Sequence, residues 1–328
     1  MPNFRTKINV SSSATSINHQ HRLLSFGSCF TENIGQRLIN FKFHNTINPF
    51  GILYNPISII NNLNRLLEND NFKENELFEN NGLWHSFAHH SIFSKMEKVE
   101  TLEGIQKHFQ TAHLALKNCN RLILTFGTAH VFENIETGEI VANCHKMPAK
   151  LFQKRRLTVL EIIEKCKLFF EKIKLQNKDL EIIVTISPVR HIRDGLLENQ
   201  KSKATLQLAV AELCEQFNFI HYFPAYEIMM DDLRDYRFYT ADMIHPNQVA
   251  IDYIWEQFQS SFFNENTQIL NRKLESINTA VQHRPFHPQS AAHQQFLKKQ
   301  LENLVFLESK HSFLDLKSEY LVFQKQIF

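Results

Sequence analysis

Three residues of the types that cooperate in nucleophilic catalysis occur in two short segments of this 328-residue chain. Ser28 follows an apolar run and a glycine, at a position where a strand should end and a helix begin. Asp242 and His245 lie three positions apart, directly before Pro246. On a turn, this spacing can bring the carboxylate to Nδ1 of the imidazole, which leaves Nε2 free to take a proton from a serine hydroxyl. The pattern predicts a serine nucleophile with a His–Asp pair as its base.

Two other interpretations of the Ser28 segment are open from the sequence. A serine after a strand is commonly the N-cap of the following helix and has no chemical role. Cys29 is a rival nucleophile, although a cysteine one residue further into a helix is more often a buried core thiol. The helix start also favours catalysis, because its free N–H groups and its dipole can stabilise an oxyanion.

The elements that must position these residues are short apolar runs that alternate with helical patterns. Periodicity predicts strands at residues 21–26, 43–47, 121–126, 180–186 and 219–222. It predicts helices at residues 31–41, 56–67, 102–116, 159–173 and 199–217, and from 246 to about 262. Repeated strand–helix units favour a parallel sheet covered on both faces, and ligands bind at the carboxyl ends of such strands. Three segments at these ends carry unusual residues: Gly27-Ser28, Gly127-Thr128 and residues 187–191.

The chain is predicted to form one α/β domain, residues 1–264, followed by a helical appendage, residues 265–328. Residues 68–101 begin with a polar, Asn-rich stretch, so we expect an insertion or loop there. Amphipathic patterns at residues 267–282 and 290–310 predict the helices of the appendage. These helices are expected to pack on the core or to make a partner contact, self-association included.

The composition is that of a globular protein, with 43% hydrophobic and 21% charged residues and a formal net charge of +2. This balance gives no reason to expect nucleic acid as a partner. Gly contributes only 8 residues, and the glycine-rich dinucleotide and P-loop motifs are missing, so no nucleotide cofactor is expected. No apolar run of about 18 residues predicts a membrane span. A polar stretch at residues 1–20 and 5 scattered Cys without C-x-x-C fit a reduced, cytoplasmic protein.

The pentapeptide at residues 27–31, Gly-Ser-Cys-Phe-Thr, is similar to the signature of the GSCFA family, which has Ala in the last position. Further similar motifs follow in order across roughly residues 23–258: residues 48–56, 84–86, 125–129, 143–146, 187–191, 233–239 and 242–246. The GSCFA family resembles the SGNH (GDSL-like) hydrolases. This resemblance implies a three-layer α/β/α, flavodoxin-like fold and a serine esterase site.

Carried over residue by residue, the resemblance makes Ser28 the nucleophile and assigns Asp242 and His245 to the closing D-x-x-H motif. Gly51 matches the glycine whose N–H joins that of Ser28 in the oxyanion hole. One position departs from the superfamily pattern, because Ala129 stands where an Asn side chain donates to the oxyanion. Loss of one such donor costs roughly 10²–10³ in rate.

Several further polar residues are candidates for the site. Asn143 is the first candidate to replace the missing oxyanion donor, and Thr128 is the second. His85, His145, Lys146, Arg190 and His191 are the candidate substrate-binding residues, in motifs or strand-end loops that should face the site. For Arg190 two roles carry equal weight: a clamp on a substrate carboxylate or phosphate, and structural pairing with an acid such as Asp194 or Glu198.

A histidine cluster, His85, His89 and His90, offers metal-ligand residue types without an H-E-x-x-H motif, so no metal site is predicted. The resulting hypothesis is a cofactor-independent serine esterase acting on a small-molecule or glycan ester, such as an acetylated carbohydrate or polyol. Two alternatives remain open. An acyltransferase would use the same machinery, and a non-catalytic carbohydrate- or metabolite-binding protein on a decayed hydrolase scaffold would account for Ala129.

Overall fold

The central element of the computed structural model, which describes residues 5–10, 13 and 15–327, is a parallel β-sheet. Its strands are β1 (Arg22–Gly27), β2 (His44–Ile47), β5 (Arg121–Phe126), β9 (Glu181–Ile186) and β10 (Ile220–Phe223). They are arranged in the order β10-β9-β5-β1-β2. Counted along the chain, this is the flavodoxin-like order 2-1-3-4-5, whose ligand crevice lies where β1 meets the third strand, β5.

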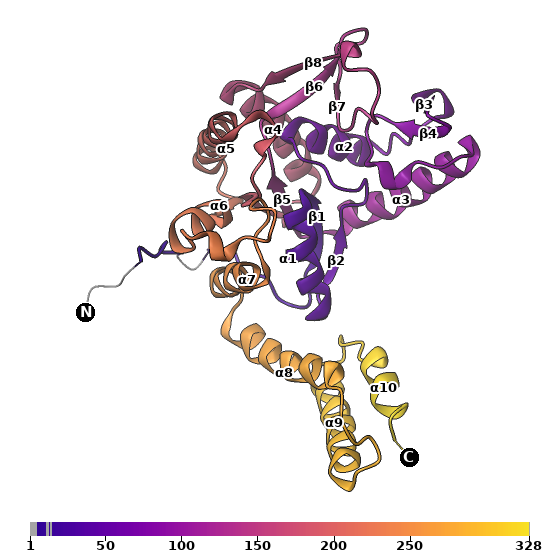
Figure 1. Cartoon of the computed structure of the whole chain (residues 1–328), viewed down its shortest axis with the longest axis vertical. Coiled ribbons are helices and arrows are strands. Elements are labelled where there is room, and N and C mark those ends of the chain that lie inside the picture. Colours follow the sequence, from indigo (N-terminus) through magenta and orange to yellow (C-terminus); the bar gives the residue numbers. More distant parts are fainter. Residues whose placement is uncertain (1–4, 11–12, 14, 328) are drawn as a thin grey trace.

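Helices cover both faces of the sheet and complete the three-layer α/β/α fold that the sequence predicts (Figure 1). One face packs against α2 (Pro56–Glu68), α3 (Lys98–Asn118), α4 (Val159–Gln176) and α5 (Leu196–Gln216). The other face packs against α1 (Cys29–Asn40) and α7 (Gln248–Phe262). Successive strand residues point to opposite faces, so Leu122 and Leu124 enter the first core and Ile123 the second. Burial on both faces explains why these strands are continuous apolar runs.

The segment expected as an insertion or loop, residues 68–101, contains an antiparallel hairpin of β3 (Leu77–Asn80) and β4 (Leu83–Ser86). A second small sheet joins β7 (Ile140–Val141), β6 (His130–Asn134) and β8 (Phe152–Arg156). Neither β8 nor the β3–β4 hairpin was predicted. These strands are short and mostly polar or exposed, so they lack the apolar runs that identify the central strands.

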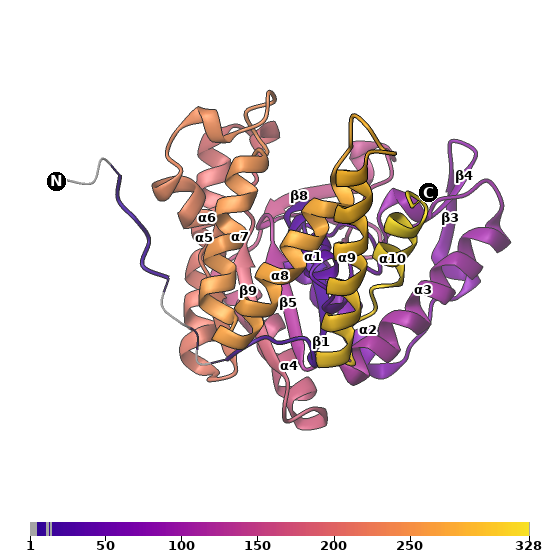
Figure 2. The ribbon, with the colours of Figure 1, turned by 90° about the horizontal axis from the view of Figure 1, so that it is seen from below.

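The C-terminal appendage consists of α8 (Glu265–Gln282), α9 (Ala291–Lys310) and α10 (Lys317–Gln324); the last was not predicted. Figures 1 and 2 show these helices on the side of the molecule where α1 and α7 lie. Their buried leucines share one apolar cluster with α1 and α7. An ion pair of 2.7 Å between Lys42 and Glu319 joins the appendage to the α/β domain. The appendage therefore packs on the core, and self-association stays a prediction.

Within the described residues, no helix combines the length and the apolar character that crossing a membrane requires.

Candidate active site

Ser28 lies between the end of β1 and the start of α1, at the edge of the sheet where ligands bind in this topology. Its Oγ accepts the Phe30 N–H at 3.3 Å, so the residue caps α1. The backbone at Ser28 is extended, and the residue is only 1% exposed. Cys29 follows inside the helix, and burial raises the pKa of its thiol, which disfavours the thiolate that a cysteine nucleophile needs.

Glycine before Ser28 is required by a close approach between strands. Gly27 has a φ of +146°, and a Cβ there would lie 2.2 Å from the Thr125 carbonyl oxygen on β5. Any larger residue would push β1 away from β5 just where the serine leaves the strand. The same reasoning applies to Gly51, which has a φ of +75° and whose Cβ would lie 2.3 Å from His90 Cβ.

Asp242 and His245 are joined directly. His245 Nδ1 lies 2.7 Å from Asp242 Oδ2, while Oδ1 accepts the Thr240 hydroxyl and the N–H groups of Ile244 and His245. These donors hold the pKa of the Asp242 carboxyl well below its usual range. The two side chains are 44% and 46% exposed, and His245 Nε2 makes no hydrogen bond to a described residue. A carboxylate that accepts from Nδ1 leaves Nε2 able to take a proton.

The loop after β9 connects this pair to the Ser28 segment. The Arg190 N–H donates to the Ile244 carbonyl at 3.3 Å, one residue before His245. The next residue, His191, turns Nε2 toward Gly127: a Cβ on Gly127 would lie 3.3 Å from His191 Nε2 and 3.5 Å from Ser28 Cβ. No hydrogen bond joins Ser28 to His245 within the described chain. His191 Nε2 and Ser28 Cβ therefore both border the space beside Gly127.

His191 Nε2 is buried and has no hydrogen-bond partner among the described residues. Its ring packs edge-on against Tyr54 with centroids 5.5 Å apart, and its backbone N–H donates to Asn199 Oδ1 at 2.9 Å. Burial, reinforced by the positive charge of Lys203, lowers the pKa of His191 to about 4. The imidazole is therefore neutral near pH 7. An unpaired buried polar atom costs stability, so His191 Nε2 is a candidate to bond a ligand.

Three polar residues on one face of α5 support this edge, and sequence reasoning missed them. Asn199, Ser202 and Lys203 are all buried. Ser202 Oγ accepts the Ala129 N–H at 2.7 Å, and Lys203 Nζ donates to the carbonyls of Gly127 at 2.7 Å and Ser187 at 2.6 Å. Their spacing in the sequence could have revealed them, because positions i, i+3 and i+4 share one helical face.

Lys203 ties the ends of β5 and β9 together from inside the protein. The residue is 1% exposed, and no described carboxylate pairs with it. Desolvation lowers its pKa to about 7, so the ammonium is partly deprotonated near neutrality. Its hydrogen bonds hold the Gly127 and Ser187 carbonyls, which follow β5 and β9.

The two candidates for the missing oxyanion donor have other partners. Asn143 Nδ2 donates to Ser91 Oγ at 3.0 Å, and the Thr128 hydroxyl lies 3.0 Å from Ser202 Oγ. The Gly51 N–H also donates, to the Asn48 carbonyl at 2.7 Å. None of these groups makes a hydrogen bond to Ser28. The buried unpaired atoms around this segment are instead His191 Nε2, Thr31 Oγ1 and Asn48 Nδ2. The amide oxygen of Asn48 accepts the Gly27 N–H at 2.9 Å.

The predicted substrate-binding residues of the hairpin region lie in an internal network. His85 Nδ1 lies 2.6 Å from Ser94 Oγ and its Nε2 3.1 Å from the Asn80 carbonyl oxygen. The rings of His85 and His145 are 4.5 Å apart, and His145 Nε2 lies 2.8 Å from the Ser86 carbonyl oxygen. Lys146 is exposed. No hydrogen bond or ring contact brings this group to Ser28 or His245, and the described residues contain no metal-binding cluster.

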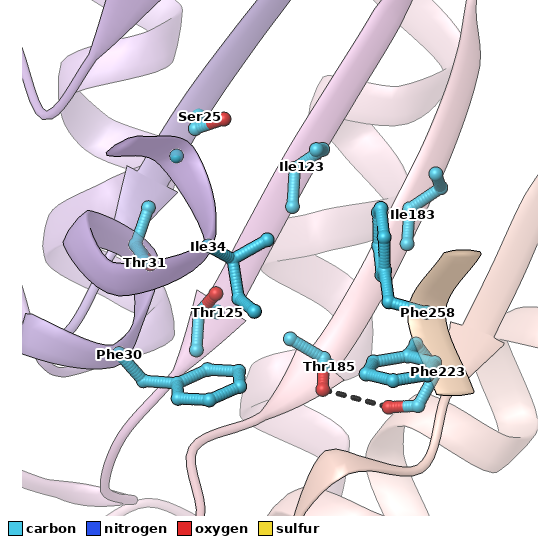
Figure 3. A pocket seen from close by; sticks show the side chains of 11 residues that line it. Ser25, Phe30, Thr31, Ile34, Ile123, Thr125, Ile183, Thr185, Phe223 and Phe258 are labelled. Carbon is cyan, nitrogen blue, oxygen red and sulfur yellow. Dashed lines mark hydrogen bonds between the residues drawn. The ribbon is translucent and has the colours of Figure 1, made fainter. Parts of the chain in front are cut away.

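Two cavities lie near these elements. The first is enclosed between α1 and the sheet, is lined by residues such as Phe30, Thr31 and Phe258, and measures about 10 Å³ (Figure 3). That volume holds roughly one water molecule, so it is no substrate site. The second measures about 450 Å³, is open to solvent, and is lined by Arg190 and three tyrosines. Its size is that of a small-molecule site.

Comparisons with known proteins give a family match across most of the chain. The GSCFA family matches residues 22–258, and the C-terminal domain of GSCFA domain proteins matches residues 274–327, a part that the resemblance found from the sequence did not reach. Among curated proteins, none matches this chain.

Two solved structures show a distant similarity to this chain. One, from Bacteroides fragilis NCTC 9343, is called a "putative acylhydrolase"; it is 14% identical, with 79% of this chain and 91% of that chain covered and a TM-score of 0.38. The other, from Streptococcus pneumonia, is called a "putative platelet activating factor"; it is 13% identical, with 75% and 84% covered and a TM-score of 0.35. From the family match over residues 22–258, this chain belongs to the GSCFA family.

Proposed function

We propose that this protein is a serine esterase that hydrolyses acyl esters, with Ser28 as nucleophile and His245 as base. The observation that carries the proposal is the Asp242–His245 pair, whose Nδ1 is held by the carboxylate while Nε2 has no described partner. The loop that bears it is bonded to Arg190, and the adjoining His191 lies beside Ser28. The topology supports the same location, since the serine leaves β1 at the crevice next to β5.

In the proposed reaction, Ser28 Oγ attacks the acyl carbonyl carbon as His245 Nε2 removes its proton. The tetrahedral oxyanion collapses to an acyl-serine, and the protonated His245 gives its proton to the leaving alkoxide. A water molecule, activated by His245, then releases the carboxylic acid. Asp242 orients the imidazole and stabilises its charged form throughout. A second alcohol in place of water would give acyl transfer by the same steps.

The oxyanion requires donors, and the described structure supports a different set from the one the sequence favours. The Ser28 N–H is one donor, at the start of α1. We assign His191 Nε2 as the side-chain donor that replaces the missing Asn, because the ring is neutral, and Nε2 is buried, unpaired and, like Ser28 Cβ, close to Gly127. Gly51 joins only if its bond to Asn48 opens. Because Ser28 is only 1% exposed, substrate entry requires a movement that opens this edge of the sheet.

Labelling with a fluorophosphonate tests this proposal, because the probe reacts only with an activated serine. Wild type should label, and Ser28→Ala should not, while Ser25→Ala serves as a control from the same strand. Equal labelling of wild type and Ser28→Ala would contradict the esterase and favour the alternative, a binding protein on a decayed hydrolase scaffold. That alternative is favoured by Ala129 and by the burial of Ser28.

The substrate class and the location of the protein are also proposals. The substrate is taken to be a small-molecule or glycan ester, such as an acetylated carbohydrate, and the cytoplasmic location rests on the scattered cysteines.

A further inference from the structure

The second cavity, of about 450 Å³, is walled mainly by tyrosine and methionine side chains. Tyr226, Tyr236 and Tyr239 line it, together with a single cation from the strand-end loop, Arg190. Apolar walls with few polar groups are the usual composition of a small-molecule pocket. Aromatic faces of this kind can pack against a ring of the ligand, and the Arg can fix its orientation.

Arg190 has no acidic partner in the described part of the chain. Asp194 pairs with Lys154, and Glu198 lies near Lys201, Arg156 and His130, so the structural pairing that the sequence left open is not formed. The guanidinium instead lies over the Tyr239 ring at 4.1 Å and the Tyr236 ring at 5.3 Å. Stacking on the ring faces orients the planar group, and the N–H donors other than the one near the Tyr239 hydroxyl are available to a planar anion.

The other charged residues at the cavity do not neutralise Arg190. Arg234 is bonded to Asp231, which leaves Arg190 as the unpaired cation of the lining. Asp235 accepts the Arg237 N–H at 2.8 Å and so caps a short helix. No ion pair joins the Asp235 carboxylate to Arg190 in the described part of the chain, so an anionic group of a ligand would be the guanidinium's ionic partner.

The cavity adjoins the proposed reacting groups. The Arg190 N–H donates to the Ile244 carbonyl, next to His245, and the following residue, His191, borders Gly127 as Ser28 does. Tyr239 lies on the same loop as Asp242, and its backbone pairs with Pro246, the residue after His245. Arg190 and Tyr239 thus belong both to the cavity lining and to the loops that carry the proposed reacting groups.

We propose that this cavity binds an anionic group, a carboxylate or a phosphate, on the alcohol part of the ester substrate, with Arg190 as the clamp. That the bound molecule is an ester rests on the proposed esterase function. That it carries an anionic group rests on the cavity alone. It restricts the substrate class from acyl esters in general to esters that carry a negative charge a few bonds from the scissile oxygen.

Binding measurements test the anion site without turnover. The probes are the non-hydrolysable amides 4-acetamidobenzoate, 4-acetamidophenyl phosphate and, as the neutral match, 4-acetamidobenzamide, each titrated calorimetrically into the full chain. Wild type should bind at least one anion about tenfold more tightly than the neutral amide. The tighter of the two anions distinguishes carboxylate from phosphate. Equal affinity for all three probes would overturn the proposal.

Arg190 is tested with two variants and a matched control. Arg190→Gln should reduce the preference for the anion to about twofold or less, and Arg190→Lys should keep part of it, because the charge remains while the fork is lost. Arg193→Gln removes an exposed charge from the same loop, outside the cavity, and should bind as wild type does. Preserved anion preference in a folded Arg190→Gln variant would contradict the assignment.

Turnover separates this proposal from the esterase itself. With 4-acetoxybenzoate and its neutral methyl ester as substrates, wild type should show a kcat/KM about tenfold higher for the anion, through KM, and Arg190→Gln should lose that difference. Anion-selective binding with no hydrolysis of either ester would contradict the esterase function and still support the anion-binding cavity. Hydrolysis of both esters without anion preference would contradict the anion-binding cavity and still support the esterase function.

Discussion

Two groups of histidines in this molecule have opposite hydrogen-bonding states. His85 and His145, beside the β3–β4 hairpin, have both ring nitrogens within 3.3 Å of protein oxygens. His191 and His245, at the carboxyl edge of the central sheet, each keep Nε2 without a described partner. The sequence offered all of them as site residues. The contrast shows that residue type and motif membership do not separate a histidine whose two ring nitrogens are hydrogen-bonded from one that keeps a ring nitrogen without a partner, and the proposed chemistry needs the second kind.

Removal of the exposed imidazole should have the largest effect on activity. His245→Ala is expected to lower kcat/KM for an acetyl ester by roughly 10²–10⁴, because the proposed proton transfer loses its base. Stability should hardly change, with an unfolding midpoint within about 2 °C of wild type, since the side chain is 46% exposed.

The matched variant comes from the other group. His145→Gln should leave kcat/KM of the folded protein within about threefold of wild type, while the loss of buried hydrogen bonds costs about 1–3 kcal/mol of stability. A large loss of activity in His145→Gln with unchanged stability would reverse the comparison and return the hairpin region to the site.

Substitution of His191 should have an effect on activity between those of His245→Ala and His145→Gln. It tests whether His191 donates a hydrogen bond to the oxyanion or only packs. His191→Phe keeps a ring of similar shape and removes the buried unpaired nitrogen, so kcat is expected to fall by roughly 10²–10³ while stability holds or rises. His191→Asn restores an amide donor at this position and should recover part of the rate. Wild-type kcat in His191→Phe, measured on the same ester, would remove His191 from the oxyanion site.

Acid should lower the stability of the protein through the buried histidines and should leave the proposed chemistry aside. Burial lowers the pKa of His145 and of His191 to about 4 and that of His89 well below its usual value. Between pH 6.5 and 4 the unfolded chain therefore binds more protons than the folded one, and the free energy of unfolding falls as the pH falls. Urea unfolding at pH 7, 5.5 and 4.5 measures this slope. His145→Gln should flatten it, and an unchanged slope would argue against a neutral buried His145.

Particular residues show how far sequence reasoning reached. The three-residue spacing of Asp242 and His245 anticipated a contact that exists, because both residues belong to one turn and no distant partner is needed. Gly27 was predicted to lie at a strand end. Its positive φ and its closeness to the Thr125 carbonyl oxygen explain why this position is a glycine. The position of His191 beside Ser28 could not be read, since it depends on how the β9 loop packs against β1 and β5 across the sheet.

Lys203 shows the same limit from the opposite direction. Within a helix rich in charged and polar residues, a lysine is expected to face solvent. Only the packing of α5 over the ends of β5 and β9 buries it and supplies two carbonyl partners. The hairpin and β8 were missed for a related reason, because a short edge strand buries too little apolar surface to leave a pattern.

By itself the sequence specifies the alternation of strands and helices, the parallel sheet that follows from it, and the local pairing of an acid with a histidine. These features depend on periodicity and on neighbours within one turn, where the residue types settle the outcome. The tertiary structure decided which polar atoms lack partners at the sheet edge and which cation lies unpaired in a cavity. Those outcomes depend on contacts between residues far apart in the chain, and the free energy of each buried polar group is set by the partners that packing happens to bring to it.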